Sequence, residues 1–126
     1  MRRVVVTGVG LVSSLGTGVE KTWEALLKGE TGIKLIESFD TEDLAVKMAG
    51  VVDDFNPEDF GIDKKELKKL ARFSQFGIAA SKMALDDSGL IIDENNAERI
   101  GVIVSSGIGG LDVFEEQHIN LVDKGA

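Results

Sequence analysis

Two continuous apolar runs, one near each end of the chain, dominate its hydrophobic pattern: Val4–Val6 and Ile100–Val104. Uninterrupted runs are typical of strands covered on both faces, whereas alternation would indicate one face in water. We therefore expect strands at about residues 2–7 and 100–104. Each run leads into a glycine-rich segment, and a buried strand that ends in such a loop is typical of α/β enzymes.

Helical spacing follows the first of these loops. A helix over residues 18–28 is expected to begin with Thr17 as its N-cap. Its buried face is expected to hold Trp23, Leu26 and Leu27.

The longest helix is expected from about Asp63 to Asp87, and a last one over about residues 110–122. Residues 64–72 are polar on most sides, whereas residues 73–85 are apolar or small nearly all round. A helix of the second kind is buried in the middle of a larger body.

Residues 30–63 lack a clear period and are interpreted as an irregular excursion from the sheet. Outside it the pattern provides only two or three strands. Two parallel strands do not make a stable sheet. We therefore expect residues 1–126 to be the opening part of a longer α/β fold.

Composition narrows the class of protein. The 126 residues are 43% hydrophobic and 29% charged, which is typical of a globular chain. The formal net charge of −8 argues against general binding to nucleic acids or anionic membranes. No apolar run is long enough for a membrane span or for the core of a signal peptide. We therefore expect a cytoplasmic protein.

Cysteine is absent, and His118 is the only histidine. No disulfide, thiolate metal site or cysteine nucleophile can come from this chain. His118 follows Glu115, Glu116 and Gln117 in a polar helical stretch, where a solvated surface histidine is expected. We therefore expect no catalytic residue, metal site or cofactor within these residues.

A dinucleotide fingerprint is the first candidate motif, because Gly8, Gly10 and Ser13 have the spacing G-x-G-x-x-G with serine in third place. A pyrophosphate-binding turn leads straight into its helix. Here the helix is expected only near Gly18, which favours a sterically tight strand exit. A small nucleotide-binding domain stays open as an alternative.

Basic residues form the second candidate. Four of them have the spacing of one helix face, and Lys64 flanks them: Lys65, Lys68, Lys69 and Arg72. On an acidic chain this stripe is either a solvated helix face or a dock for an acidic partner.

The third candidate is the run Ser105-Ser-Gly-Ile-Gly-Gly110, at the expected carboxyl end of a strand, where ligands bind in α/β sheets. No base is evident that would activate Ser105 or Ser106. Ile108 between glycines suits a pocket wall, and a plain tight turn is the alternative.

Taken together, these segments resemble the N-terminal part of the β-ketoacyl-acyl-carrier-protein synthases, and most closely the type II enzymes of bacterial fatty-acid synthesis. The matching blocks cover essentially the whole chain in order: Val4-Val-Val-Thr-Gly-Val-Gly-Leu-Val-Ser13, Trp23-Glu-Ala-Leu-Leu-Lys-Gly29, Thr31-Gly-Ile33, Arg72-Phe-Ser-Gln-Phe76, Ala84-Leu-Asp-Asp-Ser-Gly-Leu90 and Arg99-Ile-Gly-Val-Ile-Val-Ser-Ser-Gly-Ile-Gly-Gly110.

The resemblance implies a thiolase-like fold, layered α-β-α-β-α, of which this chain is the opening part of the first half. It implies a homodimer that condenses an acyl chain, held on a cysteine, with malonyl carried on acyl carrier protein. The family's cysteine, two histidines and lysine fall beyond residue 126, so the chain alone is predicted to be inactive.

Two sites follow from the resemblance. Ile108, with Gly107 beside it, matches a residue that lines the acyl-chain pocket. Three lysines match positions that dock acyl carrier protein, with Lys64 and Arg72 flanking them: Lys65, Lys68 and Lys69. Lys68 stands where arginine is common in the family, which weakens bidentate phosphate recognition. A non-catalytic carrier-binding module that uses only the lysine face is a further alternative.

Overall fold

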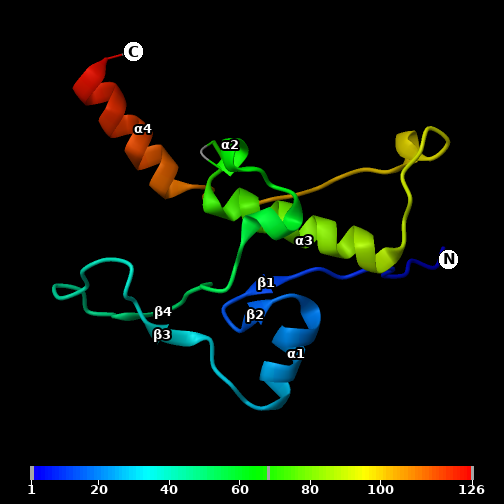
Figure 1. Cartoon of the computed structure of the whole chain (residues 1–126), viewed down its shortest axis with the longest axis horizontal. Helices are drawn as coiled ribbons and strands as arrows, with labels where there is room; N and C mark the ends of the chain where they lie inside the picture. The colour runs from blue at the N-terminus through cyan, green and yellow to red at the C-terminus, as the bar shows by residue number, and fades with distance from the viewer. Residues whose placement is uncertain (1, 68, 126) are drawn as a thin grey trace. The chain divides into compact units, whose positions relative to one another are not determined.

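The computed structural model describes residues 2–67 and 69–125 (Figure 1). Two compact units divide the chain. The first holds the residues up to Asn56 together with Ala79–Gly89, and the second holds Pro57–Ile78 together with the residues from Leu90 onward. Helix α3 (Arg72–Ser88) contributes residues to both.

A short hairpin and a helix open the first unit (Figure 1). Strands β1 (Val12–Ser13) and β2 (Gly16–Thr17) pair antiparallel, and α1 (Val19–Leu27) follows. Thr22 of α1 is buried, and its hydroxyl donates to the Gly16 carbonyl at 3.1 Å. This bond ties α1 to the hairpin, because a buried hydroxyl must find a partner.

The buried face of α1 is not the predicted one. Thr22 and Ala25 are buried, whereas the three residues expected to face the core are largely exposed: Trp23, Leu26 and Leu27. The hydrogen bond of Thr22 to the hairpin fixes which side of α1 turns inward, and hydrophobic spacing alone does not contain that constraint. The helix itself lies where the sequence predicts it.

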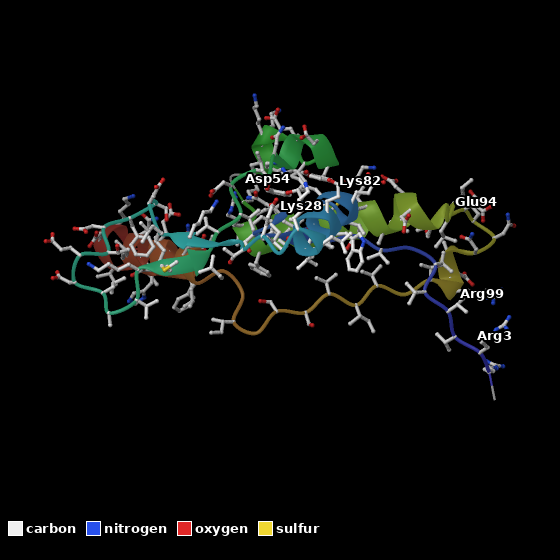
Figure 2. All side chains as sticks on the ribbon, turned by 90° about the horizontal axis from the view of Figure 1, so that it is seen from below. Arg3, Lys28, Asp54, Lys82, Glu94 and Arg99 are labelled. Atoms are coloured by element: carbon white, nitrogen blue, oxygen red, sulfur yellow. The ribbon has the colours of Figure 1, made fainter. Side chains whose placement is uncertain are left out.

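Thr17 does not cap α1, contrary to expectation. The residue before the helix is Gly18, with φ of 103°, and no side chain caps it. The carboxylate of Asp54, which is labelled in Figure 2, instead accepts the amide and the hydroxyl of Thr17, at 3.3 and 3.4 Å, and the Lys21 ammonium. The hydrogen bond from Lys21 lowers the pKa of Asp54 and outweighs the opposing effect of partial burial.

Residues 30–63 contain a second hairpin. Strands β3 (Ile33–Leu35) and β4 (Met48–Gly50) pair antiparallel with Leu35 opposite Met48. The amide of Ile36 donates to the Lys47 carbonyl at 2.9 Å and extends the pairing. Phe55 is buried after the hairpin, whereas Phe39 in its loop is 57% exposed.

The two expected strands at residues 2–7 and 100–104 do not form. Both segments run extended but pair with no strand among the described residues. Their side chains are exposed, Val4 at 91% and Ile103 at 97%. A strand needs the backbone of a neighbour for its hydrogen bonds, so the apolar runs indicate buried positions without supplying the partner.

The expected single helix over 63–87 is interrupted. A 3₁₀ turn, η1 (Pro57–Phe60), precedes α2 (Lys64–Leu67), and α3 begins only at Arg72. The Gln75 side chain donates to the Leu70 carbonyl at 2.9 Å, and the Ala71 carbonyl accepts the amide of Ser74 at 2.9 Å. These bonds start a new helix instead of continuing α2.

Helix α3 is only partly covered by the described residues. Ala79 is fully buried, but Phe73, Ile78 and Leu85 are each about 40% exposed. No self-contained sheet lies among the described residues, whose strands form only the two hairpins.

The second unit ends with η2 (Ala97–Arg99), an extended run and α4 (Leu111–Lys124), close to the expected last helix. None of the helices in the described part of the chain is long and apolar enough to cross a membrane.

Candidate functional site

The glycine-rich segment after the first apolar run is a packing contact. A Cβ on Gly8 would lie 2.2 Å from the Ala84 carbonyl oxygen, and one on Gly10 would lie 2.1 Å from the Ala80 carbonyl oxygen. Both oxygens belong to the backbone of α3, which cannot yield to a methyl group. The two glycines therefore let the extended segment lie directly against α3.

The same contact argues against a phosphate-binding loop. The amide of Val9, between the two glycines, donates to the Asp87 carboxylate of α3 at 2.8 Å. A pyrophosphate in this place would meet a carboxylate instead of a free amide. The next residues form the β1–β2 hairpin instead of a helix. The sterically tight strand exit is the interpretation that the geometry supports.

Lys64 and Lys65 lie on α2, Lys69 lies between α2 and α3, and Arg72 begins α3, so the described basic residues do not share one helix face. Asp63 caps α2, since its carboxylate accepts the amides of Lys65 and Glu66 at 2.7 and 3.0 Å. Lys65 and Lys69 are exposed. Lys68 lies outside the described residues.

The two flanking basic residues are engaged locally. The Lys64 ammonium lies 3.3 Å from the Glu58 carboxylate, and this exposed pair offsets the charge of Lys64. The Arg72 guanidinium lies over the ring of Phe76, 5.0 Å from its centre. Lys65 and Lys69 are therefore the cations of the described stripe best placed for a partner.

Ile108 is presented at the tip of a tight turn. Its side chain is 79% exposed, and a Cβ on Gly107 would meet no atom within 4 Å. Gly109 has φ of 85°, a left-handed value that favours glycine. The Ser106 hydroxyl oxygen accepts the amide of Gly109 at 3.0 Å, so the bond spans Ile108.

The start of α3 supports the far side of this turn. A Cβ on Gly110 would lie 2.5 Å from the Cβ of Ala71 and 3.4 Å from the ring of Phe73. The turn therefore lies against the residues on either side of Arg72. Sequence reasoning located Ile108 and missed the supports, Ser106 and Phe73, because nothing in their spacing indicates a contact.

The described contact of His118 is with an aromatic ring. It lies on α4, and its ring stacks on that of Phe114, with centres 6.4 Å apart and planes 4° apart. Within the described ranges, no three histidine, cysteine or acidic residues gather as metal ligands would. What these residues can provide is an apolar turn and a basic surface.

Residues 1–125 match the family model described as "Beta-ketoacyl synthase, N-terminal domain". The chain is 52% identical over 124 residues to the 3-oxoacyl-[acyl-carrier-protein] synthase 2 of Vibrio harveyi, and 49% identical over 124 residues to that of Staphylococcus aureus (strain COL). Each match covers 98% of this chain and 30% of the relative, so the chain spans less than one third of the length of these curated relatives.

Two solved structures share the fold. A β-ketoacyl synthase from Burkholderia phymatum STM815 matches with a TM-score of 0.76 at 25% identity, over 100% of this chain and 31% of its own. The ishigamide ketosynthase/chain length factor matches with a TM-score of 0.73 at 35% identity, over 97% and 31%. These similarities confirm the expected fold class, the opening part of a thiolase-like α/β fold, and do not favour a nucleotide-binding domain.

Proposed function

The chain belongs to the β-ketoacyl synthase family and corresponds to the N-terminal domain of such an enzyme. We therefore propose that the whole protein elongates fatty acyl chains. In the proposed reaction, C2 of malonyl on acyl carrier protein bonds to the carbonyl carbon of an acyl thioester. The malonyl carboxylate leaves as CO₂, and the acyl group's thiol is released. The observation that carries the proposal is the similarity to 3-oxoacyl-[acyl-carrier-protein] synthases along essentially the whole chain.

The catalytic groups are not assigned to these 126 residues. The chain holds no cysteine, and its one histidine lies exposed on α4. Thioester exchange needs an activated thiol. We therefore assign to this segment two other tasks, binding the acyl chain and docking its carrier, and expect the segment alone to be inactive.

Ile108 and Gly107 are assigned to the wall of the acyl-chain pocket. An acyl chain is recognised by apolar side chains with no hydrogen-bonding demand. Ile108 projects from the turn with 79% of its surface exposed, and Gly107 leaves open space beside it. A branched apolar side chain in such a place can limit how far an acyl chain extends.

Lys65 and Lys69 are assigned to the docking of acyl carrier protein. Lys68 is assigned to the same surface from its position in the sequence, because it lies outside the described residues. An acidic partner is steered toward exposed cations, even on a chain of net charge −8. Lys64 contributes less, because Glu58 lies 3.3 Å from its ammonium. Arg72 lies at the edge of the surface, stacked on Phe76.

The test is a condensation assay with the full-length protein, acyl and malonyl carrier proteins, and detection of the elongated product. Lys65→Glu and Lys69→Glu are each expected to raise KM for malonyl-acyl carrier protein about fivefold, the equivalent of ~1 kcal/mol of binding free energy. The effect should shrink at high salt, since exposed charges are screened.

Lys28→Glu is the matched control, because Lys28 is an exposed lysine directly after α1 and its reversal changes the net charge equally. Its KM should stay within twofold of the parent. If all three charge reversals raised KM equally, the effect would come from net charge, and Lys65 and Lys69 would not form a docking site. No elongated product from the parent protein would overturn the proposed function itself.

For the assembly and location of the protein, we extend the proposal to a homodimer in the cytoplasm. The support is the resemblance to the enzymes of bacterial fatty-acid synthesis. Sedimentation of the full-length protein distinguishes a dimer from a monomer.

A further inference from the structure

The turn that carries Ile108 is held by two different kinds of contact. Three glycines surround the isoleucine, at positions 107, 109 and 110. Glycine restricts the backbone less than any other residue, so a side chain between glycines has no fixed direction unless other contacts close the turn. Two supports are present, and they act on opposite sides of Ile108.

The support on the C-terminal side is packing. Gly110 lies so close to Ala71 that an added Cβ would be 2.5 Å from the Ala71 side chain, and the Phe73 ring lies near both Gly109 and Gly110. These contacts fix where the turn meets α3 and α4. They do not reach Gly107, around which the structure leaves open space.

The support on the N-terminal side is one hydrogen bond. The Ser106 hydroxyl accepts the amide of Gly109 at 3.0 Å and closes the backbone around Gly107 and Ile108. Ser105, one residue earlier, is exposed and makes no such side-chain bond among the described residues. Both adjacent serines are exposed, and only Ser106 makes the bond across the turn among the described residues.

We propose that Ser106 is a positioning residue for Ile108: its hydroxyl holds the turn so that the isoleucine stands at one place along the acyl-chain pocket. This inference rests on the proposed function, because it needs Ile108 to line that pocket. Without the bond the turn samples several conformations, and Ile108 meets the acyl chain at varying depth. Ser106 thereby sharpens the chain-length limit without touching the reacting atoms.

The experiment uses the full-length enzyme and acyl primers of increasing length. Chain-length discrimination is measured as kcat/KM for the longest good primer divided by kcat/KM for the primer two carbons longer. Ser106→Ala is expected to lower this ratio about three- to tenfold, the range of one neutral hydrogen bond. Ser106→Thr keeps the hydroxyl and should retain the parent ratio within twofold, as should Ser105→Ala.

The outcomes separate this inference from the proposed function. A purely structural role of Ser106 would lower kcat/KM for all primers equally and leave the ratio unchanged, which would overturn the inference. So would equal effects of Ser105→Ala and Ser106→Ala, or a threonine that fails to restore the ratio. Ile108→Phe in the same assay tests the pocket wall: if it shifts the limit while Ser106→Ala does not, only the positioning role is lost. If neither variant changes the ratio, the assignment of Ile108 to the pocket is itself wrong.

Discussion

Replacing Gly10 with valine is expected to leave little folded protein, and replacing it with alanine to destabilise the full-length protein by about 1–3 kcal/mol. An alanine Cβ would lie 2.1 Å from the Ala80 carbonyl oxygen and 2.7 Å from the Ala84 amide nitrogen. Both atoms belong to the main chain of α3, so the helix must shift as a body. The shift also stretches the bond between the Val9 amide and Asp87. Soluble yield and thermal unfolding of the full-length variants measure the effect.

The matched control lies on α3 itself. Among the described residues, a Cβ on Gly77 would meet the Val104 side chain alone, at 3.5 Å, an ordinary contact. Gly77→Ala should therefore be neutral or stabilising by up to about 1 kcal/mol, since alanine favours a helix more than glycine does. An unfolding midpoint of Gly10→Ala equal to that of the parent would contradict the packing role of Gly10.

A titration of the parent protein decides whether the glycine segment binds a nucleotide. If it bound a dinucleotide, the parent protein would bind NAD or FAD. The packing role predicts no binding by the parent at all. Asp87 supplies the reason, because its carboxylate already occupies the Val9 amide that a phosphate would need.

The helices show how far the sequence alone leads. α1 and α4 lie where spacing and stop signals predict them, because both features are local. The break before Arg72 has no local signal, since residues 64–72 contain neither proline nor glycine. It depends on bonds such as that from Gln75 to Leu70, which only the structure reveals.

The strands show the opposite limit. The valines and isoleucines in residues 4–6 and 100–104 lie in segments that run extended (Figure 1). Whether such a segment becomes a strand is decided by a neighbouring chain segment, and the composition of the run carries no information on that neighbour. The hairpin β3–β4 is the opposite case, because it forms in a stretch whose sequence has no clear period. Its pairing depends on strand register more than on hydrophobic periodicity.

The candidate site was found by residue type and placed by structure. An apolar residue among glycines after an apolar run is visible in the sequence, as is a stripe of lysines. The partners that modify them are not: Glu58 beside Lys64, the Phe76 ring under Arg72, and the Ser106 hydroxyl behind Ile108. The contacts of Glu58 and Ser106 depend on turns whose geometry the spacing does not determine, whereas Arg72 and Phe76 are neighbours at i and i+4 of α3.

Ile108→Phe in the full-length enzyme is expected to shorten the longest acyl chain that is elongated. Phenylalanine is larger than isoleucine, and the Ile108 side chain is 79% exposed, so the described residues leave room for a larger ring. The added volume then displaces the end of a long acyl chain but leaves a short one untouched. We expect kcat/KM for the longest good primer to fall about 10- to 200-fold, the discrimination that a hydrophobic pocket achieves per methylene, with short primers within twofold of the parent.

Ile33→Phe provides the comparison, because Ile33 of β3 is a half-exposed isoleucine that the proposal does not place in the pocket. It can alter the total rate, but the profile of rate against primer length should keep its shape. Ile108→Val, which removes one methylene, should move the limit in the opposite direction, toward longer chains. A profile that Ile108→Phe leaves unaltered would remove Ile108 from the pocket. A uniform loss for every primer length would show instead that the turn supports the fold alone, since only a side chain beside the acyl chain can distinguish one length from another.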